Sequence, residues 1–136
     1  MDFLKSIAIA ASGLRAQAGR MRVISENLAN TDSTAQSPGK DPFRRKIATF
    51  RGEMDRALDA RTVALGRVRT DPSGFRIRHE PGHPADDASG NVKYPNVNAM
   101  IEMHDMREAQ RSYEANINVI GATRRMIQRT LDILKA

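Results

Sequence analysis

Two histidines, His79 and His83, come closest in this sequence to a metal-binding pair. On a helix, a separation of four residues would place both imidazole rings on one face, where they could bind zinc. A proline and a glycine stand between them and prevent that helix. The only further ligands close by are Asp86 and Asp87. We therefore predict a structured loop here and not a metal site.

Catalytic residue patterns are missing from the rest of the sequence. No Ser-His-Asp set, phosphate-holding glycine loop or pair of catalytic carboxylates stands out. Cysteine is absent, which excludes disulfides, thiolate metal sites and cysteine nucleophiles. His104 lies beside an apolar helix seam and is predicted to be a packing or surface residue. We predict no enzyme, no metal, no cofactor and no small-molecule substrate.

The stretch from about residue 96 to 134 is predicted to be one long helix. Its apolar residues recur at alternating steps of three and four, as in a helix that packs along its length against other helices. Such a helix would span roughly 55 Å, more than the width of a compact domain, so it needs a partner outside an ordinary core. The seam positions are Met103, Met106, Gln110, Tyr113, Ile117, Ile120, Arg124, Ile127, Leu131 and Leu134.

A second helix is predicted at the N-terminus, with the same three-four spacing. Gly13 and Gly19 each cost about 1 kcal/mol relative to alanine, so this helix is predicted to be stable only when packed. A further apolar stripe, Ile9, Ala16 and Val23, lies on nearly the opposite face and is predicted to contact neighbouring molecules. The first seam consists of Leu4, Ile7, Ala11, Leu14, Ala18, Met21, Ser25 and Leu28.

The centre of the chain is predicted to be a polar loop followed by short strands. Residues 31–42 are rich in Ser, Thr, Pro and Gly, which favours a loop. The fold class is therefore mainly α with a small β-rich centre, in which the long N- and C-terminal helices pair as a coiled coil and pack into a helical assembly. Within the centre we predict strands at 43–50, 62–70 and 75–79, a short helix near 53–60 and a turn at 71–74.

Positive charge is concentrated in the middle of the chain. The formal net charge is +6, and residues 40–80 alone carry eleven Lys or Arg against six Asp or Glu, a net charge of +5. This excess fits a solvated surface, a match to acidic partner subunits, or a nucleic-acid site. The region lacks interleaved aromatics and any helix-turn-helix or zinc-finger spacing. A basic nucleic-acid-binding helical protein is therefore the alternative function, which a salt-dependent gel shift would favour.

The N-terminus superficially resembles a signal peptide. Its apolar run at residues 7–11 is too short, however, and Asp2 stands where positive charge should dominate. No apolar run approaches the roughly eighteen residues of a membrane-spanning helix. We expect this segment to belong to the mature protein and any export to proceed without a cleaved signal.

Several short motifs resemble those of the flagellar rod and hook axial proteins. The run Asn-Leu-Ala-Asn-Thr-Asp-Ser at 27–33 is similar to the signature near the start of these proteins. Pro-Gly-His-Pro-Ala-Asp at 81–86 and Pro-Asn-Val-Asn at 95–98 are similar to a motif pair before their closing helix, and 111–116 is similar to part of that helix. The resemblance covers both ends of the chain but not residues 51–78.

The resemblance implies a structural subunit of the proximal rod of the flagellar basal body. Such a subunit polymerises with copies of itself and other rod proteins to form the axial drive shaft and export channel. Residues 1–33 and 96–136 would form an inner coiled-coil domain, and 34–95 an outer loop and β-rich segment. The implied location is the periplasmic rod. Further implied partners are the membrane ring of the basal body and the flagellar type III export apparatus, and no nucleic acid is among them.

Two groups of residues are predicted to meet partners. The first is an assembly interface drawn from the helices and the motifs: Leu14, Met21, Leu28, Asn30, Tyr113, Asn116, Ile117, Ile120, Ile127 and Leu131. The second contains cations of the basic centre that are predicted to meet acidic neighbours in the rod or ring: Arg44, Arg45, Lys46, Arg76 and Arg78.

Overall fold

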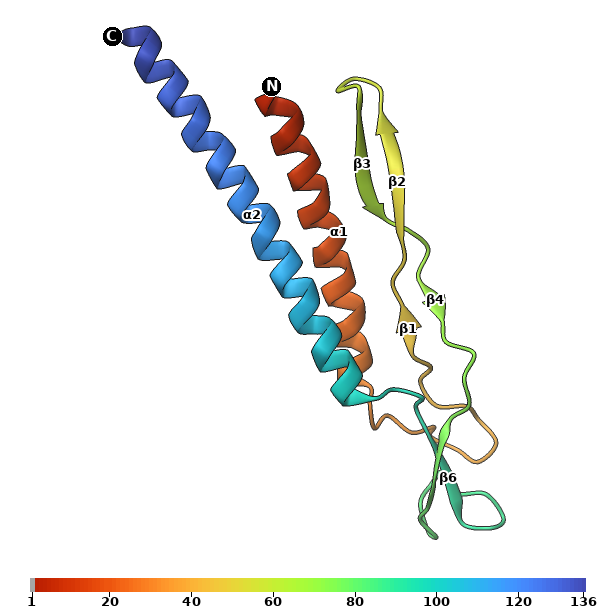
Figure 1. Cartoon of the computed structure of the whole chain (residues 1–136). Helices are drawn as coiled ribbons and strands as arrows, with labels where there is room; N and C mark the ends of the chain where they lie inside the picture. Colours follow the sequence, from red (N-terminus) through yellow and green to blue (C-terminus); the bar gives the residue numbers. More distant parts are fainter. Residues whose placement is uncertain (1) are drawn as a thin grey trace. The chain divides into compact units, whose positions relative to one another are not determined.

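The computed structural model describes residues 2–136, which form two long helices and six short strands (Figure 1). The two helices pack together and small antiparallel sheets lie between them in the sequence, which confirms the predicted fold class. Within residues 2–136, no helix combines the length and apolar character that crossing a membrane requires. The elements are α1 (Phe3–Ala29), β1 (Lys46–Ile47), β2 (Phe50–Asp55), β3 (Ala60–Leu65), β4 (Arg69–Thr70), β5 (Arg76–His79), β6 (Asn91–Tyr94) and α2 (Ala99–Lys135).

Side-chain caps fix where both helices begin. The Asp2 carboxylate accepts the backbone N–H groups of Leu4 and Lys5, at 3.1 and 3.2 Å. The Asn98 side-chain oxygen accepts the N–H of Met100 at 3.0 Å in the same way. Both caps satisfy N–H groups that the first turn of a helix leaves without partners. Asn98 therefore sets the start of α2, three residues after the predicted position.

The contacts within the chain divide it into two compact units, each with a part of both helices. Unit 1 contains residues 2–21, 48–67 and 107–136, and unit 2 contains residues 22–47 and 68–106. The predicted division into an inner domain of 1–33 and 96–136 and an outer segment of 34–95 stays a prediction.

In unit 1, a β-hairpin lies along α1. Strand β2 pairs with β3 in antiparallel register, from Phe50 opposite Leu65 to Asp55 opposite Ala60. Figure 1 shows β3 between α1 and β2, and the backbone N–H of Val63 donates to the buried Ser12 hydroxyl at 3.1 Å. A β-carbon on Gly19 would come within 2.9 Å of the Leu65 side chain, so the hairpin packs closely on this helix.

The short helix predicted near 53–60 is wrong, because this segment forms the β2–β3 hairpin and its turn. The Asp55 carboxylate accepts the N–H groups of Ala57 and Leu58, at 3.0 and 3.2 Å. Asp59 adopts a left-handed backbone with φ of 47°. Aspartate side chains that bond nearby backbone groups favour turns over helix interiors, which explains the difference.

The predicted strands also change in extent and pairing. The strand expected at 62–70 is split into β3 and β4, because the N–H of Gly66 donates to Thr49 at 2.6 Å and closes the hairpin there. A β-carbon on Gly66 would lie 2.7 Å from the Thr49 side chain, so glycine allows this close approach. The strand expected at 43–50 is reduced to the two residues of β1, which pair with β4.

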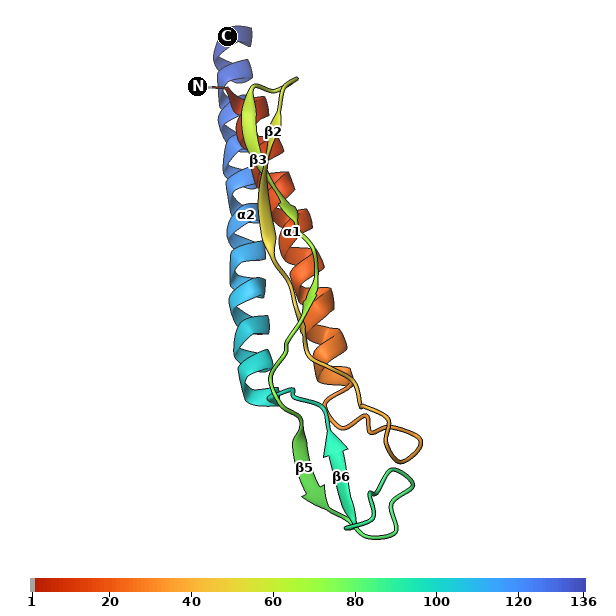
Figure 2. The same ribbon diagram turned by 90° about the vertical axis from the view of Figure 1, so that its right-hand side faces the viewer.

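Unit 2 is built around the β5–β6 hairpin, whose antiparallel strands are visible in Figure 2. The turn at 71–74 connects β4 to β5 without pairing them, and β5 pairs instead with β6, from Arg76 opposite Tyr94 to His79 opposite Asn91. The side chains of Val92 and Val97 are fully buried. Pro95 and Val97 of the motif at 95–98 therefore belong to the core of this unit, and the motif leads directly into α2.

Candidate assembly surface

In unit 1, α2 turns a different face toward its own chain than the seam predicts. Ala109 and Thr123 are buried, and the half-buried Asn116 lies between them at the same seven-residue spacing. The Asn116 amide approaches Gly13 of α1 so closely that a β-carbon on this glycine would lie 2.8 Å from the amide oxygen. The predicted seam contained Gln110, Ile117 and Arg124 at these positions. The row that faces α1 lies one residue earlier, so the predicted register is wrong here.

Two polar residues can occupy this row because each satisfies itself within the helix. The Asn116 amide donates to the Ser112 carbonyl at 2.9 Å, and the Thr123 hydroxyl donates to the Val119 carbonyl at 2.9 Å. Burying a polar group is costly mainly when it has no hydrogen-bond partner. Small size and internal hydrogen bonds let the two helices approach here, and an apolar repeat does not report either property.

The predicted assembly residues fall into two classes of exposure. Ile117 is 47% exposed and Leu131 is 45% exposed, so both leave apolar surface uncovered by their own chain. The role of the set as an interface stays a prediction. The other members are half-buried: Leu14, Met21, Leu28, Asn30, Tyr113, Asn116, Ile120 and Ile127.

The second stripe of α1 has the opposite role to the one predicted. Ala16 and Val23 are buried within their own chain, so they do not await neighbouring molecules. Ile9 alone of this stripe stays partly exposed. The first seam is the more exposed one, with Leu4 and Ala18 on the surface. The hairpin and α2 together cover one side of α1, and the sequence did not reveal the hairpin.

The sequence also missed a second exposed apolar row on α2. Val119, Met126 and Ile133 are seven residues apart and therefore lie on nearly one face of the helix. All three are exposed. Their even spacing was the available signal, and the stronger three-four seam masked it. In unit 1, α2 thus exposes apolar side chains on both flanks of its buried row.

The close approach at Gly13 gives a matched pair of substitutions. We expect Gly13→Ala to lower the free energy of unfolding by up to about 2 kcal/mol, because the strain of pressing its new methyl group on Asn116, about 1–3 kcal/mol, exceeds the gain of about 1 kcal/mol from replacing a helical glycine. At Gly121 the nearest atom to an added β-carbon is an Arg125 nitrogen at 3.5 Å, so Gly121→Ala should raise stability by up to about 1 kcal/mol. Urea denaturation of both variants checks the pair, and equal shifts of one sign would refute the close contact.

In unit 2, Asn27 joins three segments of the chain. Its side-chain oxygen accepts the Lys46 N–H at 2.8 Å, and its amide donates to the Lys46 carbonyl at 2.8 Å and to the Glu102 carboxylate at 3.0 Å. Asn27 is 1% exposed. One buried amide thereby binds the end of α1 to strand β1 and to the first turns of α2. The motif at 27–33 contained this residue, but its spacing did not indicate this role.

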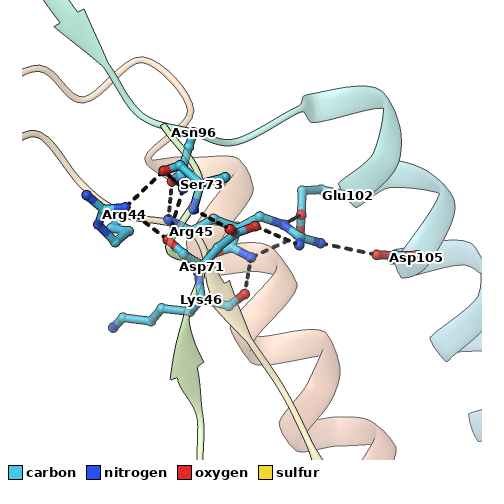
Figure 3. Close-up of polar contacts among 9 residues, drawn as sticks. Arg44, Arg45, Lys46, Asp71, Ser73, Asn96, Glu102 and Asp105 are labelled. Carbon is cyan, nitrogen blue, oxygen red and sulfur yellow. Dashed lines mark hydrogen bonds and ion pairs between the residues drawn. The ribbon is translucent and has the colours of Figure 1, made fainter. Parts of the chain in front are cut away.

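Arg45 lies at the centre of an acidic cluster (Figure 3). Its guanidinium donates to the buried Glu102 carboxylate at 2.5 Å and forms ion pairs with Asp71 at 3.5 Å and Asp105 at 3.6 Å. Burial alone would lower the pKa of Arg45, but the hydrogen bond and charge of Glu102, with those of Asp71, outweigh it and raise that pKa. Arg45 is therefore firmly held as a cation inside its own chain.

Asp71 makes part of the stability of unit 2 depend on pH. Hydrogen bonds from the Ser73 backbone and hydroxyl, and then the charge of Arg45, lower the pKa of Asp71 below its ordinary value. A carboxyl with a lowered folded-state pKa stabilises the fold above its unfolded pKa and loses that contribution as the pH falls through the folded value.

We expect the free energy of unfolding to decrease as the pH falls below about 4, near the ordinary pKa of aspartate. In Asp71→Asn the free energy of unfolding should fall less steeply with decreasing pH than in the unchanged chain, because the variant lacks this carboxyl. Urea denaturation at a series of pH values checks both chains. An unchanged pH dependence in the variant would show that the network at Asp71 contributes nothing measurable.

The other predicted contact cations also have partners within unit 2. Arg44 donates to the Asp71 and Ser73 carbonyls and lies 4.2 Å from the centre of the Phe75 ring. Lys46 pairs with Glu26 at 2.5 Å. The remaining two engage carbonyl oxygens and an aromatic ring: Arg76 donates to Pro95 and Thr31, and Arg78 lies 4.6 Å from the centre of the Tyr94 ring. Much of the basic excess is thus used inside the chain.

His79 is the last residue of β5, and His83 lies in the loop between β5 and β6. The ring of His83 accepts the Ala85 N–H at 3.1 Å and lies 3.5 Å from the Thr34 hydroxyl, while His79 faces Asn91 at 3.3 Å. Among residues 2–136, no group of three His, Cys, Asp or Glu side chains is placed to hold a metal ion. The His79 ring thus faces the paired strand β6, and the His83 ring contacts its own loop and Thr34.

Comparison with known proteins gives consistent similarities. Residues 88–133 match the family model described as flagellar basal body rod FlgEFG protein C-terminal. The flagellar basal-body rod protein FlgC of Agrobacterium fabrum is 49% identical, over 100% of this chain and 99% of the relative. FlgC of Salmonella typhimurium is 36% identical over 98% of both chains, and FlgC of Bacillus subtilis is 33% identical over 99% of this chain and 100% of the relative.

Proposed function

Because this chain belongs to the FlgC family of flagellar basal-body rod proteins and is a structural subunit of that rod, we propose that the exposed flanks of α2 bind neighbouring subunits. The family is structural and not enzymatic. Rod membership takes the place of the alternative function, a basic nucleic-acid-binding protein. The observation that carries the proposal is the uncovered apolar surface at Ile117 and Leu131, beside the row that faces α1. Apolar surface of this kind, repeated along a helix, commonly marks a binding face.

The residues predicted from the helix seams and the motifs are the proposed contacts with neighbouring rod subunits. The half-buried members contact both their own chain and a neighbouring subunit. The two exposed members contact the neighbouring subunit alone. This division follows from burial: Tyr113, Ile120 and Ile127 each keep part of their surface open. Contacts between different faces of identical subunits extend into a filament when their rotation does not close a ring. The same face would also receive other rod proteins.

The family resemblance supports three finer proposals. The chain is a proximal-rod subunit, and polymerisation with its copies and other rod proteins builds the axial shaft and export channel. Residues 1–33 and 96–136 form the inner domain of that shaft, and 34–95 form the outer segment. The membrane ring and the type III export apparatus are its further partners, and the chain lies in the periplasmic part of the rod.

Electrostatic contact with acidic neighbours is proposed for the basic centre as well. Arg78 and Arg76 are the best placed, because their side chains stay partly exposed while they hold their partners within the chain. Arg44, Arg45 and Lys46 are weaker candidates for this contact, because carboxylates of the same chain already pair with Arg45 and Lys46 and carbonyl oxygens accept from Arg44. Charge-neutral substitutions that leave assembly and its salt sensitivity unchanged would remove this part of the proposal.

The direct test of the proposed function is complementation. In a strain whose own gene for this chain is deleted, the intact chain should restore swimming and be recovered in purified basal bodies. Its recovery only in the soluble fraction of a motile strain would overturn the proposal.

A further inference from the structure

Strand β2 has an edge that its own chain leaves open. The backbone N–H of Val63 points away from β2, since it donates to Ser12 of α1. In antiparallel pairs, directly opposite residues turn their backbone groups the same way, either toward each other or outward. Gly52 is opposite Val63, so the outward-facing groups of β2 belong to Phe50, Gly52 and Met54. Within residues 2–136, β2 pairs with β3 alone.

In the part of the chain that the structure describes, this edge has no proline, lysine or covering element, and its only charged residues before Asp55, Arg51 and Glu53, neutralise each other. Proteins commonly cover an edge strand or place lysine, proline or a bulge on it, because open backbone groups attract another strand. Here the central residue is glycine, and an added β-carbon on Gly52 would meet no atom within 4 Å. Phe50 and Met54 are both exposed beside it. A hollow of about 240 Å³, lined by Gly52, Glu53, Met54 and Arg61, leaves space beside β2 for side chains of another molecule.

The five residues from Phe50 to Met54 are complementary to their own reverse. We propose that two copies of the chain pair antiparallel through β2, with Gly52 of one copy opposite Gly52 of the other. This register places Arg51 opposite Glu53 of the second copy, and Phe50 opposite Met54 of the second copy. Opposite charges directly across a strand pair attract, and a methionine sulfur packs well on an aromatic ring.

The backbone geometry independently selects the same register. The outward-facing groups at positions 50, 52 and 54 meet those at positions 54, 52 and 50 of the second copy. These three pairs are therefore of the hydrogen-bonded type, and two hairpins become one four-stranded sheet. Arg51 and Glu53 pair within one strand at 2.5 Å, and their side chains are 65% and 46% exposed, so both can also reach a second copy.

A contact of this kind relates the two copies by a two-fold axis. Both copies use the same surface, so the contact closes on itself and does not extend a filament. The β2 dimer is therefore a state of the free protein. It does not depend on the proposed rod contacts of α2, so either proposal can fail without the other. It predicts a soluble dimer of the purified chain.

Charge reversal tests the register directly in the purified, full-length chain. In Arg51→Glu both positions are acidic and in Glu53→Arg both are basic, so each variant repels its own copies across the strand pair. We expect each variant alone to dimerise at least about tenfold more weakly than the unchanged chain, as measured by sedimentation equilibrium. An equimolar mixture of the two should form a heterodimer, because each acidic position then faces a basic one. The mixture separates pairing between chains from any loss of the ion pair within a strand.

Cysteine cross-linking gives a second measurement, because the chain contains no cysteine of its own. Gly52→Cys should form a disulfide-linked dimer under mild oxidation, since the proposed register places the two α-carbons within disulfide reach. Arg51→Cys should cross-link more slowly, because it faces position 53 and not itself. A chain that stays monomeric at every soluble concentration would overturn the inference. So would single charge variants that dimerise like the unchanged chain, or equal cross-linking at positions 51 and 52.

Discussion

Arg45→Met is expected to lower the free energy of unfolding by about 3–5 kcal/mol. The substitution removes the cation that donates to Glu102, a carboxylate that is 1% exposed, and leaves Asn27 as its main remaining donor. A buried charge without its partner keeps its desolvation cost and loses the attraction that offset it. Urea denaturation of the purified chain, followed by circular dichroism, measures the change.

An exposed arginine supplies the matched control. Arg69 lies on β4 with an exposed side chain, so Arg69→Met should change stability by no more than about 0.5 kcal/mol. Replacing both Arg45 and Glu102 by methionine should recover much of the lost free energy of unfolding, because the buried carboxylate is then removed together with its cation. A single Arg45→Met variant as stable as the control would show that the cluster does not hold unit 2 together.

Ile117→Asp is expected to abolish swimming while leaving the purified chain folded. Ile117 is 47% exposed in its own chain, so a carboxylate there stays hydrated in the free protein. In the proposed rod contact the same carboxylate would be buried against apolar neighbours without a partner, which costs several kcal/mol at each subunit. Soft-agar swimming of the complemented deletion strain measures the loss, and circular dichroism of the free chain shows whether the fold survives.

Asn118→Asp is the control for charge, because it adds the same carboxylate one residue further along α2 at an exposed position. On a helix this neighbour points about 100° away from Ile117. We expect the Asn118→Asp strain to swim. A swimming Ile117→Asp strain would remove this face of α2 from the proposed interface.

The sequence predicted the long elements well and the polar interior poorly. Apolar spacing is enough to predict two helices, because a buried helix face must repeat every three or four residues. It misplaced the contact row of α2 by one residue, since Ala109 and Thr123 contribute little to an apolar pattern yet allow close packing. Glu102 stands beside the predicted seam position Met103, and apolar spacing contains no signal for the burial of this carboxylate.

The β-rich centre shows why local patterns are not sufficient. The segment 53–60 has a composition that a short helix tolerates, but the Asp55 turn and the pairing of β2 with β3 decide its structure. Strand pairing depends on contacts between distant parts of the chain, which a short window of sequence does not contain. The predicted interface residues were found from spacing and family motifs, and their contacts depend on molecules outside this chain.

We propose that this rod subunit contacts other subunits through the flanks of α2. A density map of basal bodies purified from the complemented strain, at a resolution that shows side chains, tests it most directly. We expect the chain to lie in the rod, with Ile117 and Leu131 covered by neighbouring subunits. A map in which these two side chains face solvent or an open channel, with the neighbours bound elsewhere, would contradict it.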